Sequence, residues 1–246
     1  MSILSAAFSR PIAHRGLHDR DAGIIENSQS AFAAAIDSNY AIECDIQLTG
    51  DDIPVVFHDY SLDRLTAQKG KLRDISADQL ARISLTGCNT APQIFSQFLS
   101  QIDGQVPLIV ELKSQNERNL ALAESVLQAA KDYSGALVFK SFDPRLLGAL
   151  RDLNCKWPLG IVLEKEKPPE ATWAQGFVLR HLLHYPSTKF DFLSCNVDDL
   201  TLPMVLFFRA LGFSVMTWTV KDEADLLAAH THADQIVFEG SITTMI

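Results

Sequence analysis

Residues 41–48 read Ala41-Ile42-Glu43-Cys44-Asp45-Ile46-Gln47-Leu48, a mostly apolar run that carries acids at alternate positions. Successive side chains of a β-strand point to opposite faces, so Glu43 and Asp45 are expected to share one face. An apolar run of this length is typical of a parallel strand that is buried on both sides. Because buried charges are costly unless they are paired or bind a metal, the run indicates both a parallel sheet and a functional site.

Similar short runs alternate with amphipathic stretches along the whole chain. The eight predicted strands cover residues 11–13, 41–48, 108–112, 137–141, 159–163, 192–195, 214–219 and 235–238. The clearest predicted helices cover residues 27–38, 118–133, 144–153, 202–211 and 222–230. We expect Asn27 or Ser28 to cap the first of these helices and Asp222 to cap the last.

About eight β-then-α units in 246 residues predict one α/β domain, residues 1–246, folded as a closed (β/α)₈ TIM barrel. The alternative is an open doubly wound sheet. A glycine-rich dinucleotide loop after the first strand would favour that alternative, and none is present.

Two segments interrupt the alternation of strands and helices. Residues 59–106 follow a short run at 54–58, after the second strand, and predict a small inserted subdomain with helices near 76–82 and 92–102. Residues 164–191 contain an aromatic pattern at 173–190, which we interpret as an outer barrel helix. If this pattern is instead exposed near the barrel mouth, a substrate with one acyl chain could bind there.

The composition and charge argue against nucleic acid and membranes as binding partners. The net charge is −9, and no basic run exceeds two residues, so nucleic-acid binding is not expected. Stable membrane association is not expected either, because there is no apolar run of 18 residues and no polybasic segment. The four cysteines form no CxxC pair and the start resembles no secretory signal, which together favour free thiols and a cytoplasmic location.

Polar residues stand at the ends of several predicted strands, where a barrel places its chemistry. They are His14, Arg15, Glu43, Asp45, His58, Glu111 and Lys113. Three convergent carboxylates with few cations favour a hard divalent cation, Mg²⁺ or Ca²⁺ with Mn²⁺ as an alternative, over zinc. The remaining histidines, His18, His181, His184, His230 and His232, are interpreted as surface or core residues.

The order of these motifs resembles the glycerophosphodiester phosphodiesterase family. The matching segments are His14-Arg15-Gly16, Glu26-Asn27-Ser28, Glu43-Cys44-Asp45, His58-Asp59, Leu62-Asp63-Arg64-Leu65-Thr66, Glu111-Leu112-Lys113, Ser141-Phe142 and Trp218-Thr219-Val220. The resemblance implies a TIM barrel with an insertion after His58, a metal held by Glu43, Asp45 and Glu111, and a catalytic pair of His14 and His58. The chain departs from the family pattern at Ile25 and over residues 233–240, and residues 164–191 match no family feature.

The resemblance implies hydrolysis of a glycerophosphodiester to glycerol 3-phosphate and an alcohol. Arg15 and Lys113 are expected to bind phosphate oxygens, with His14 as general base and His58 as general acid. Trp218 is expected either to form a wall for the glycerol carbons or to pack in the barrel core. A cyclic phosphate intermediate and direct attack by water both remain open.

Three rival functions are weighed against this interpretation. A metal-dependent aldolase or enolase-like lyase would use the same fold, but two histidines suit phosphoryl transfer better. A non-catalytic phosphodiester-binding barrel would be expected to lack one of the histidines or carboxylates, and all five are present. The third is hydrolysis of a lysophospholipid, against which a water-soluble, deacylated substrate is expected.

Overall fold

The computed structural model describes residues 2–166 and 171–244 of the chain. Eight parallel strands form a closed barrel, because β1 pairs with β2 on one side and with β9 on the other. These strands are β1 (Ile12–Ala13), β2 (Ala41–Leu48), β4 (Leu108–Leu112), β5 (Leu137–Ser141), β6 (Leu159–Leu163), β7 (Phe192–Asn196), β8 (Ser214–Val220) and β9 (Gln235–Phe238). A short ninth strand, β3 (Pro54–Val56), lies antiparallel to β2 at its far end.

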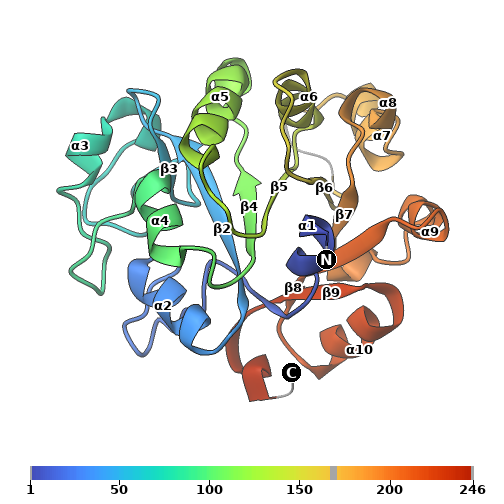
Figure 1. Cartoon of the computed structure of the whole chain (residues 1–246), viewed down its shortest axis with the longest axis horizontal. Helices are drawn as coiled ribbons and strands as arrows, with labels where there is room; N and C mark the ends of the chain where they lie inside the picture. Colours follow the sequence, from blue (N-terminus) through green and yellow to red (C-terminus); the bar gives the residue numbers. More distant parts are fainter. Residues whose placement is uncertain (1, 167–170, 245–246) are drawn as a thin grey trace.

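The closed barrel confirms the predicted (β/α)₈ fold and excludes the open sheet. Every predicted strand is present, with ends that differ by at most one residue. Helices surround the barrel (Figure 1). They are α2 (Gln29–Asp37), α4 (Phe95–Ile102), α5 (Asn119–Ala130), α6 (Pro144–Asp152), α7 (Trp173–Arg180), α8 (Tyr185–Thr188), α9 (Pro203–Ala210) and α10 (Glu223–His232). Short 3₁₀ turns are η2 (Asn116–Arg118), η3 (Val197–Asp199) and η4 (Gly240–Thr244).

The predicted helix caps are present, with one refinement that concerns the site. Ser28 accepts a hydrogen bond from the backbone N–H of Ala31 at the start of α2, and Asp222 caps α10. Asn27, the other cap candidate, instead donates its side-chain amide to Asp45 in the barrel. The residue next to the cap is therefore committed to the site.

An apolar layer fills the N-terminal half of the barrel. Its inward-pointing side chains are Ile12, Ala41, Ile109, Val138, Phe192, Met216 and Val237. Gly160 makes room for Phe192, since a Cβ there would lie 2.3 Å from the ring. The N-terminal helix α1 (Ile3–Ala7) packs against this layer and closes that end of the barrel (Figure 1).

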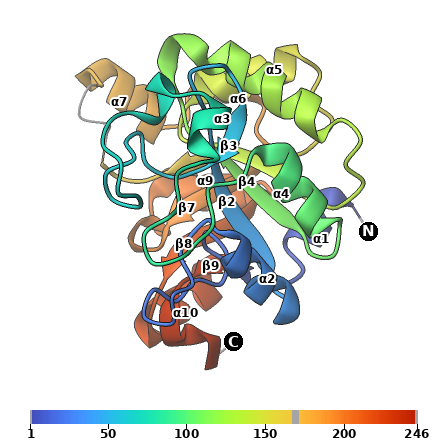
Figure 2. The ribbon, with the colours of Figure 1, turned by 90° about the vertical axis from the view of Figure 1, so that its left-hand side faces the viewer.

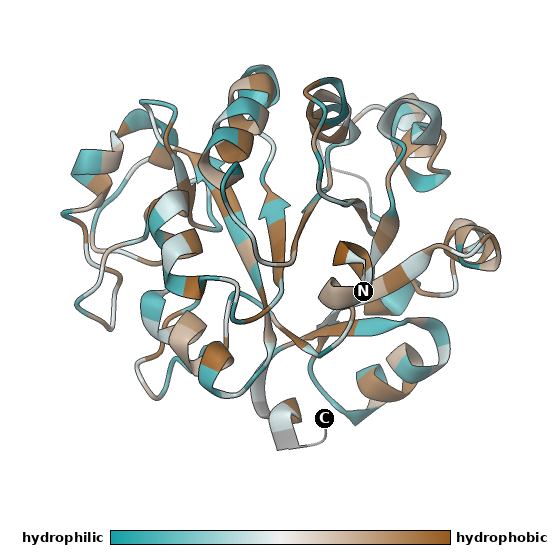
Figure 3. Ribbon diagram, viewed as in Figure 1, coloured by the Kyte–Doolittle hydropathy of each residue, from teal (hydrophilic) through white to brown (hydrophobic). Residues whose placement is uncertain are grey.

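The strand period of two places charged residues directly above the apolar layer. Glu43 follows Ala41, Glu111 follows Ile109, and Lys140 follows Val138, each by two positions on the same strand. All of these side chains therefore point into the barrel. Figure 3 shows the contrast between the largely hydrophobic strands and the surrounding helices, which carry both hydrophobic and hydrophilic faces.

The segment 59–106 contains two different parts. Residues 59–94, with η1 (Leu72–Asp74) and α3 (Ala77–Leu80), pack around a second hydrophobic core separate from the main one. This core consists of Ile25, Val55, Phe57, Leu62, Leu65, Leu72, Leu80 and Leu85. In contrast, α4 buries Phe95 and Phe98 in the main core and serves as a barrel helix.

The aromatic pattern at 173–190 forms two short helices, which corrects the expectation of one outer helix. Tyr185 of α8 and the following Phe190 pack against Phe208 and Phe213. All residues of α7 are described, and none of them is buried. In Figure 2, α7 and α1 lie on opposite sides of the molecule. Within the described part of the chain, no helix is both long enough and apolar enough to span a bilayer.

Candidate active site

The turn after β1 positions the first two site residues. Arg15 and Gly16 both have positive φ, 55° and 78°. Gly16 lies so close to α2 that a Cβ there would approach the backbone of Ala31 to 2.9 Å, so glycine is required. The turn directs the backbone N–H of Arg15 toward Glu43 Oε2, at 3.2 Å. The His-Arg-Gly motif is thus explained by packing as well as by charge.

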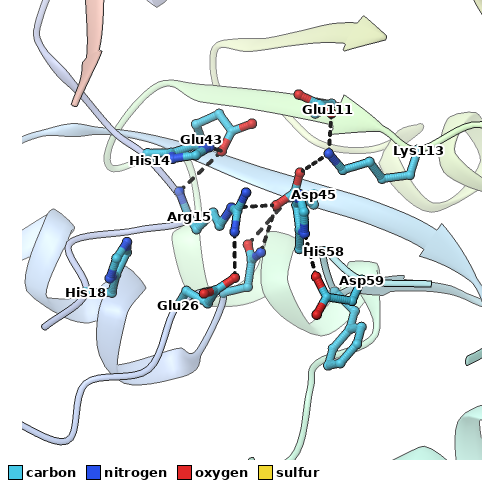
Figure 4. A network of polar contacts seen from close by, with 12 residues as sticks. His14, Arg15, His18, Glu26, Glu43, Asp45, His58, Asp59, Glu111 and Lys113 are labelled. Carbon is cyan, nitrogen blue, oxygen red and sulfur yellow. Dashed lines mark hydrogen bonds and ion pairs between the residues drawn. The ribbon is translucent and has the colours of Figure 1, made fainter. Parts of the chain in front are cut away.

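Three carboxylates form the floor of the site, as Figure 4 shows. Glu43 and Asp45 of β2 lie beside Glu111 of β4, because Asp45 pairs in register with Glu111. All three side chains are buried, and one oxygen of each lies within 4.8 Å of the others. Oxygens that bind one ion at 2.0–2.6 Å lie at most about 5 Å apart, so this set fits a single hard divalent cation.

Positive side chains surround the same carboxylates. Lys113 Nζ lies 3.0 Å from Asp45 Oδ1 and 2.5 Å from Glu111 Oε1. Lys140, fully buried on β5, lies 3.0 Å from Glu43 Oε1 and 3.2 Å from Glu111 Oε2. Burial alone would raise the pKa of Asp45, but Lys113 and the other nearby cations hold it well below its usual range. Burial would also raise the pKa of Glu111, but Lys113 and Lys140 lower it, so both of these carboxylates are ionised.

One oxygen of the floor is left without a proper hydrogen bond. Among the described residues, Glu43 Oε1 is buried and accepts none of good geometry, although Lys140 is near. A buried carboxylate oxygen that accepts no hydrogen bond is costly. An additional cation at the carboxylates would satisfy it, so the residues fit the divalent metal that the sequence predicts.

Each of the two predicted catalytic histidines is oriented by a carboxylate that contacts its Nδ1. His14 Nδ1 lies 2.5 Å from Glu239 Oε1, and His58 Nδ1 lies 2.7 Å from Asp59 Oδ1. Each carboxylate fixes the orientation of its imidazole and leaves Nε2 for other contacts. Burial alone would raise the pKa of Glu239, but the hydrogen bond with His14 and the nearby cations hold it well below its usual range.

Arg64 from the inserted segment links Asp59, which contacts His58, to Glu26, which contacts Arg15. Its guanidinium binds Asp59 through Nε at 2.6 Å and binds both oxygens of Glu26. Glu26 in turn accepts a hydrogen bond from Arg15 at 2.7 Å. Arg15 and Lys113, which are expected to bind phosphate, are thus already paired with carboxylates of the site.

These residues surround a cavity of about 530 Å³. Its walls include His14, Arg15, His58, Glu111, Lys113 and Trp218. Trp218 donates its indole N–H to the backbone oxygen of Ser194 and packs edge-on against Phe142. It therefore lines the cavity and also packs against the apolar layer of the barrel, and its contact with the glycerol carbons stays a prediction.

Several site residues were not expected from the sequence. Lys140 is not among the predicted strand-end residues, although it follows Val138 by two positions and so points into the barrel. Glu239 stood in a segment noted only as a departure from the family. His18, interpreted as a surface or core residue, lines the cavity and lies 3.8 Å from Glu239.

A comparison with protein-family models decides the family. The model of the glycerophosphoryl diester phosphodiesterase family matches residues 14–243. This chain belongs to that family. It is accordingly an enzyme of the phosphodiesterase class, and the match includes every predicted site residue.

Individual relatives of this phosphodiesterase are distant. Bovine glycerophosphodiester phosphodiesterase 1 is 24% identical over 257 residues, which cover 92% of this chain and 76% of that protein. A putative glycerophosphodiester phosphodiesterase of Bacillus subtilis is 23% identical over 222 residues, 86% of each chain.

Solved structures show the same fold. A phosphodiesterase from Oleispira antarctica, solved with its product sn-glycerol-3-phosphate, has a TM-score of 0.79 and is 21% identical, covering 95% of this chain and 94% of that one. A putative phosphodiesterase from Silicibacter pomeroyi DSS-3 also has a TM-score of 0.79, at 22% identity, covering 96% and 93%.

Proposed function

We propose that this phosphodiesterase hydrolyses water-soluble glycerophosphodiesters to glycerol 3-phosphate and an alcohol. One observation carries the proposal: two imidazoles, each held through Nδ1 by a carboxylate, line one cavity above a buried carboxylate cluster. Family membership supports the reaction class. The product bound to the Oleispira antarctica relative supports glycerol 3-phosphate as one product.

Glu43, Asp45 and Glu111 would hold one divalent cation, Mg²⁺ or Ca²⁺ with Mn²⁺ as an alternative. The all-oxygen donor set and the unsatisfied Glu43 Oε1 support this assignment. Such a cation supplies Lewis-acid polarisation of a phosphate oxygen.

The histidines would transfer the protons of the reaction. We assign His14 as general base toward the attacking hydroxyl or water, and His58 as general acid toward the leaving alkoxide. The carboxylates on Nδ1, Glu239 and Asp59, keep each ring in one orientation, with Nε2 free to exchange a proton with the substrate. This paired arrangement supports a mechanism in which one imidazole loses a proton as the other gains one.

Arg15 and Lys113 would bind the phosphate oxygens, and Trp218 would contact the glycerol carbons. All three line the catalytic cavity. A phosphodiester is anionic, whereas the chain as a whole has a net charge of −9. The positive side chains of Arg15 and Lys113 at the cavity wall therefore support a role in attracting the substrate. A cytoplasmic location is proposed on the free cysteines, of which Cys44 and Cys195 are buried.

The experiment that tests the function is release of glycerol 3-phosphate from glycerophosphocholine by the purified protein. We expect turnover that is lost with a chelator and restored by Mg²⁺, Ca²⁺ or Mn²⁺. Release that persists after complete removal of divalent ions would contradict the metal assignment. No release under any metal condition would contradict the substrate.

A further inference from the structure

A second cavity, of about 220 Å³, opens beside the catalytic one. Its walls come from the end of β5, from β6 and from α7, and most of them are apolar. Phe142 and Glu164 line both cavities, so the two are adjacent and share a wall. The second cavity belongs to the segment that the proposed function leaves unexplained. We call it the α7 groove.

One side of the α7 groove is a stack of aromatic rings. Trp173, Phe177 and His181 follow one another at intervals of four residues and line the groove together. The ring centroids of Trp173 and Phe177 are 5.7 Å apart, and those of Phe177 and His181 are 4.1 Å apart, both stacked. Trp173 is 79% exposed and Phe177 44% exposed. Large aromatic side chains that line a hollow and stay exposed favour a ligand over core packing.

We infer that the α7 groove binds the acyl chain of a singly acylated glycerophosphodiester whose phosphate lies in the catalytic cavity. The inference rests on the proposed function and extends its substrate class. A volume of about 220 Å³ has room for roughly seven groups of about 30 Å³, the volume share of a water molecule and close to that of a methylene. The groove therefore suits part of one hydrocarbon chain.

Trp218 and Phe142 support a chain carried on the glycerol. Trp218, which would contact the glycerol carbons, packs on Phe142 with ring centroids 5.6 Å apart. Phe142 is also a wall of the α7 groove. A chain that leaves the glycerol beside Trp218 would thus cross Phe142 directly into the groove.

The charges around the groove argue against a membrane surface as its occupant. Glu164, Lys165, Glu166 and Arg180 all line it, so acidic and basic groups are balanced. Binding to anionic bilayers is favoured by an excess of Lys and Arg, which this rim does not carry. The groove is also concave, whereas helices that lie in a bilayer present a protruding apolar face.

The inference is tested with 1-acyl-glycerophosphocholines of two to ten acyl carbons, each kept below its micellar concentration. Burial of a methylene is worth up to about fourfold in binding. We expect KM to fall two- to fourfold per methylene until about seven are bound, and then to level off. Isothermal titration with octylphosphocholine measures the same binding without turnover.

Phe177→Gln provides the decisive variant and Phe207→Gln its matched control. Phe207 is 52% exposed on α9 and lines neither cavity. We expect Phe177→Gln to raise KM for the octanoyl substrate about five- to tenfold. Turnover of glycerophosphocholine should stay within about twofold in both variants, and Phe207→Gln should match the wild type throughout.

Each alternative occupant has its own outcome. A flat chain-length series, with glycerophosphocholine still cleaved, would overturn the acyl-chain site and leave the proposed function intact. A dependence seen only when the chain is carried on the leaving alcohol would also overturn it. Vesicle binding or dimerisation that is lost in Phe177→Gln, without a chain-length effect, would assign the groove to a membrane or to a second copy.

Discussion

Removing the charge of Lys140 is expected to destabilise the protein and to make its stability strongly dependent on metal. Lys140 is fully buried and lies within 3.2 Å of oxygens of both Glu43 and Glu111. Burial alone would lower the pKa of Lys140, but the two carboxylates raise it, so the side chain is charged. Lys140→Met would leave a buried carboxylate cluster with one cation fewer. Breaking a buried ion pair on one side costs about 3–5 kcal/mol.

For a chain of this size, each kcal/mol corresponds to about 2–4 °C in Tm, so metal-free Lys140→Met should melt about 6–20 °C below the wild type. A divalent cation should restore more stability to the variant than to the wild type, because it no longer competes with the lysine. At an effective dielectric of 20, two unit charges about 4 Å apart interact by roughly 4 kcal/mol. Even a third of that corresponds to about tenfold in Kd.

The assay is thermal unfolding with chelator and with a Mg²⁺ or Ca²⁺ titration, followed by isothermal titration of the metal. Lys131→Met, at the exposed end of α5, is the matched control and should change Tm little. Lys140 is not an internal competitor of the metal if the metal-free Lys140→Met variant has the same Tm as the metal-free wild type. The same conclusion follows if the variant binds the cation no more tightly than the wild type does.

Three further predictions concern chemistry, pH and dynamics. His14→Ala and His58→Ala should each lower turnover of glycerophosphocholine about 10²-fold or more, with little change in Tm, and near-normal turnover would remove that histidine from the mechanism. Burial lowers the pKa of His184 to about 4 from 6.5, so the unfolded chain binds a proton that the folded chain does not in that interval. The free energy of unfolding should therefore fall by up to about 3 kcal/mol from pH 6.5 to 4, and His184→Asn should lack this decrease in urea titrations. We expect residues 59–94 of the inserted segment to form a mobile cover on one side of the barrel mouth. They should exchange amide hydrogens faster than the barrel strands and gain protection with glycerol 3-phosphate, and protection equal to that of the strands and unchanged by product would contradict this.

The sequence determined the barrel because each strand is recognisable locally. Buried parallel strands appear as short apolar runs, and the intervening helices carry one apolar face and recognisable caps such as Ser28 and Asp222. The period of two along a strand predicted that Glu43 and Asp45 share one face, and the apolar run around Glu111 placed that residue on another strand. The carboxyl ends of all barrel strands meet at one mouth, so residues distant in sequence could be expected to converge.

What the sequence did not reveal depends on distances between segments that are far apart in the chain. Glu239 orients His14 across 225 positions, and Lys140 is placed between Glu43 and Glu111 only by the register of three strands. Local patterns describe whether a residue is buried, but not which partner it contacts. The same limit applies to α7, because its aromatic spacing fits both a packed outer helix and an exposed groove wall. Only the tertiary structure decides between them, because it leaves Trp173 and Phe177 exposed beside the groove.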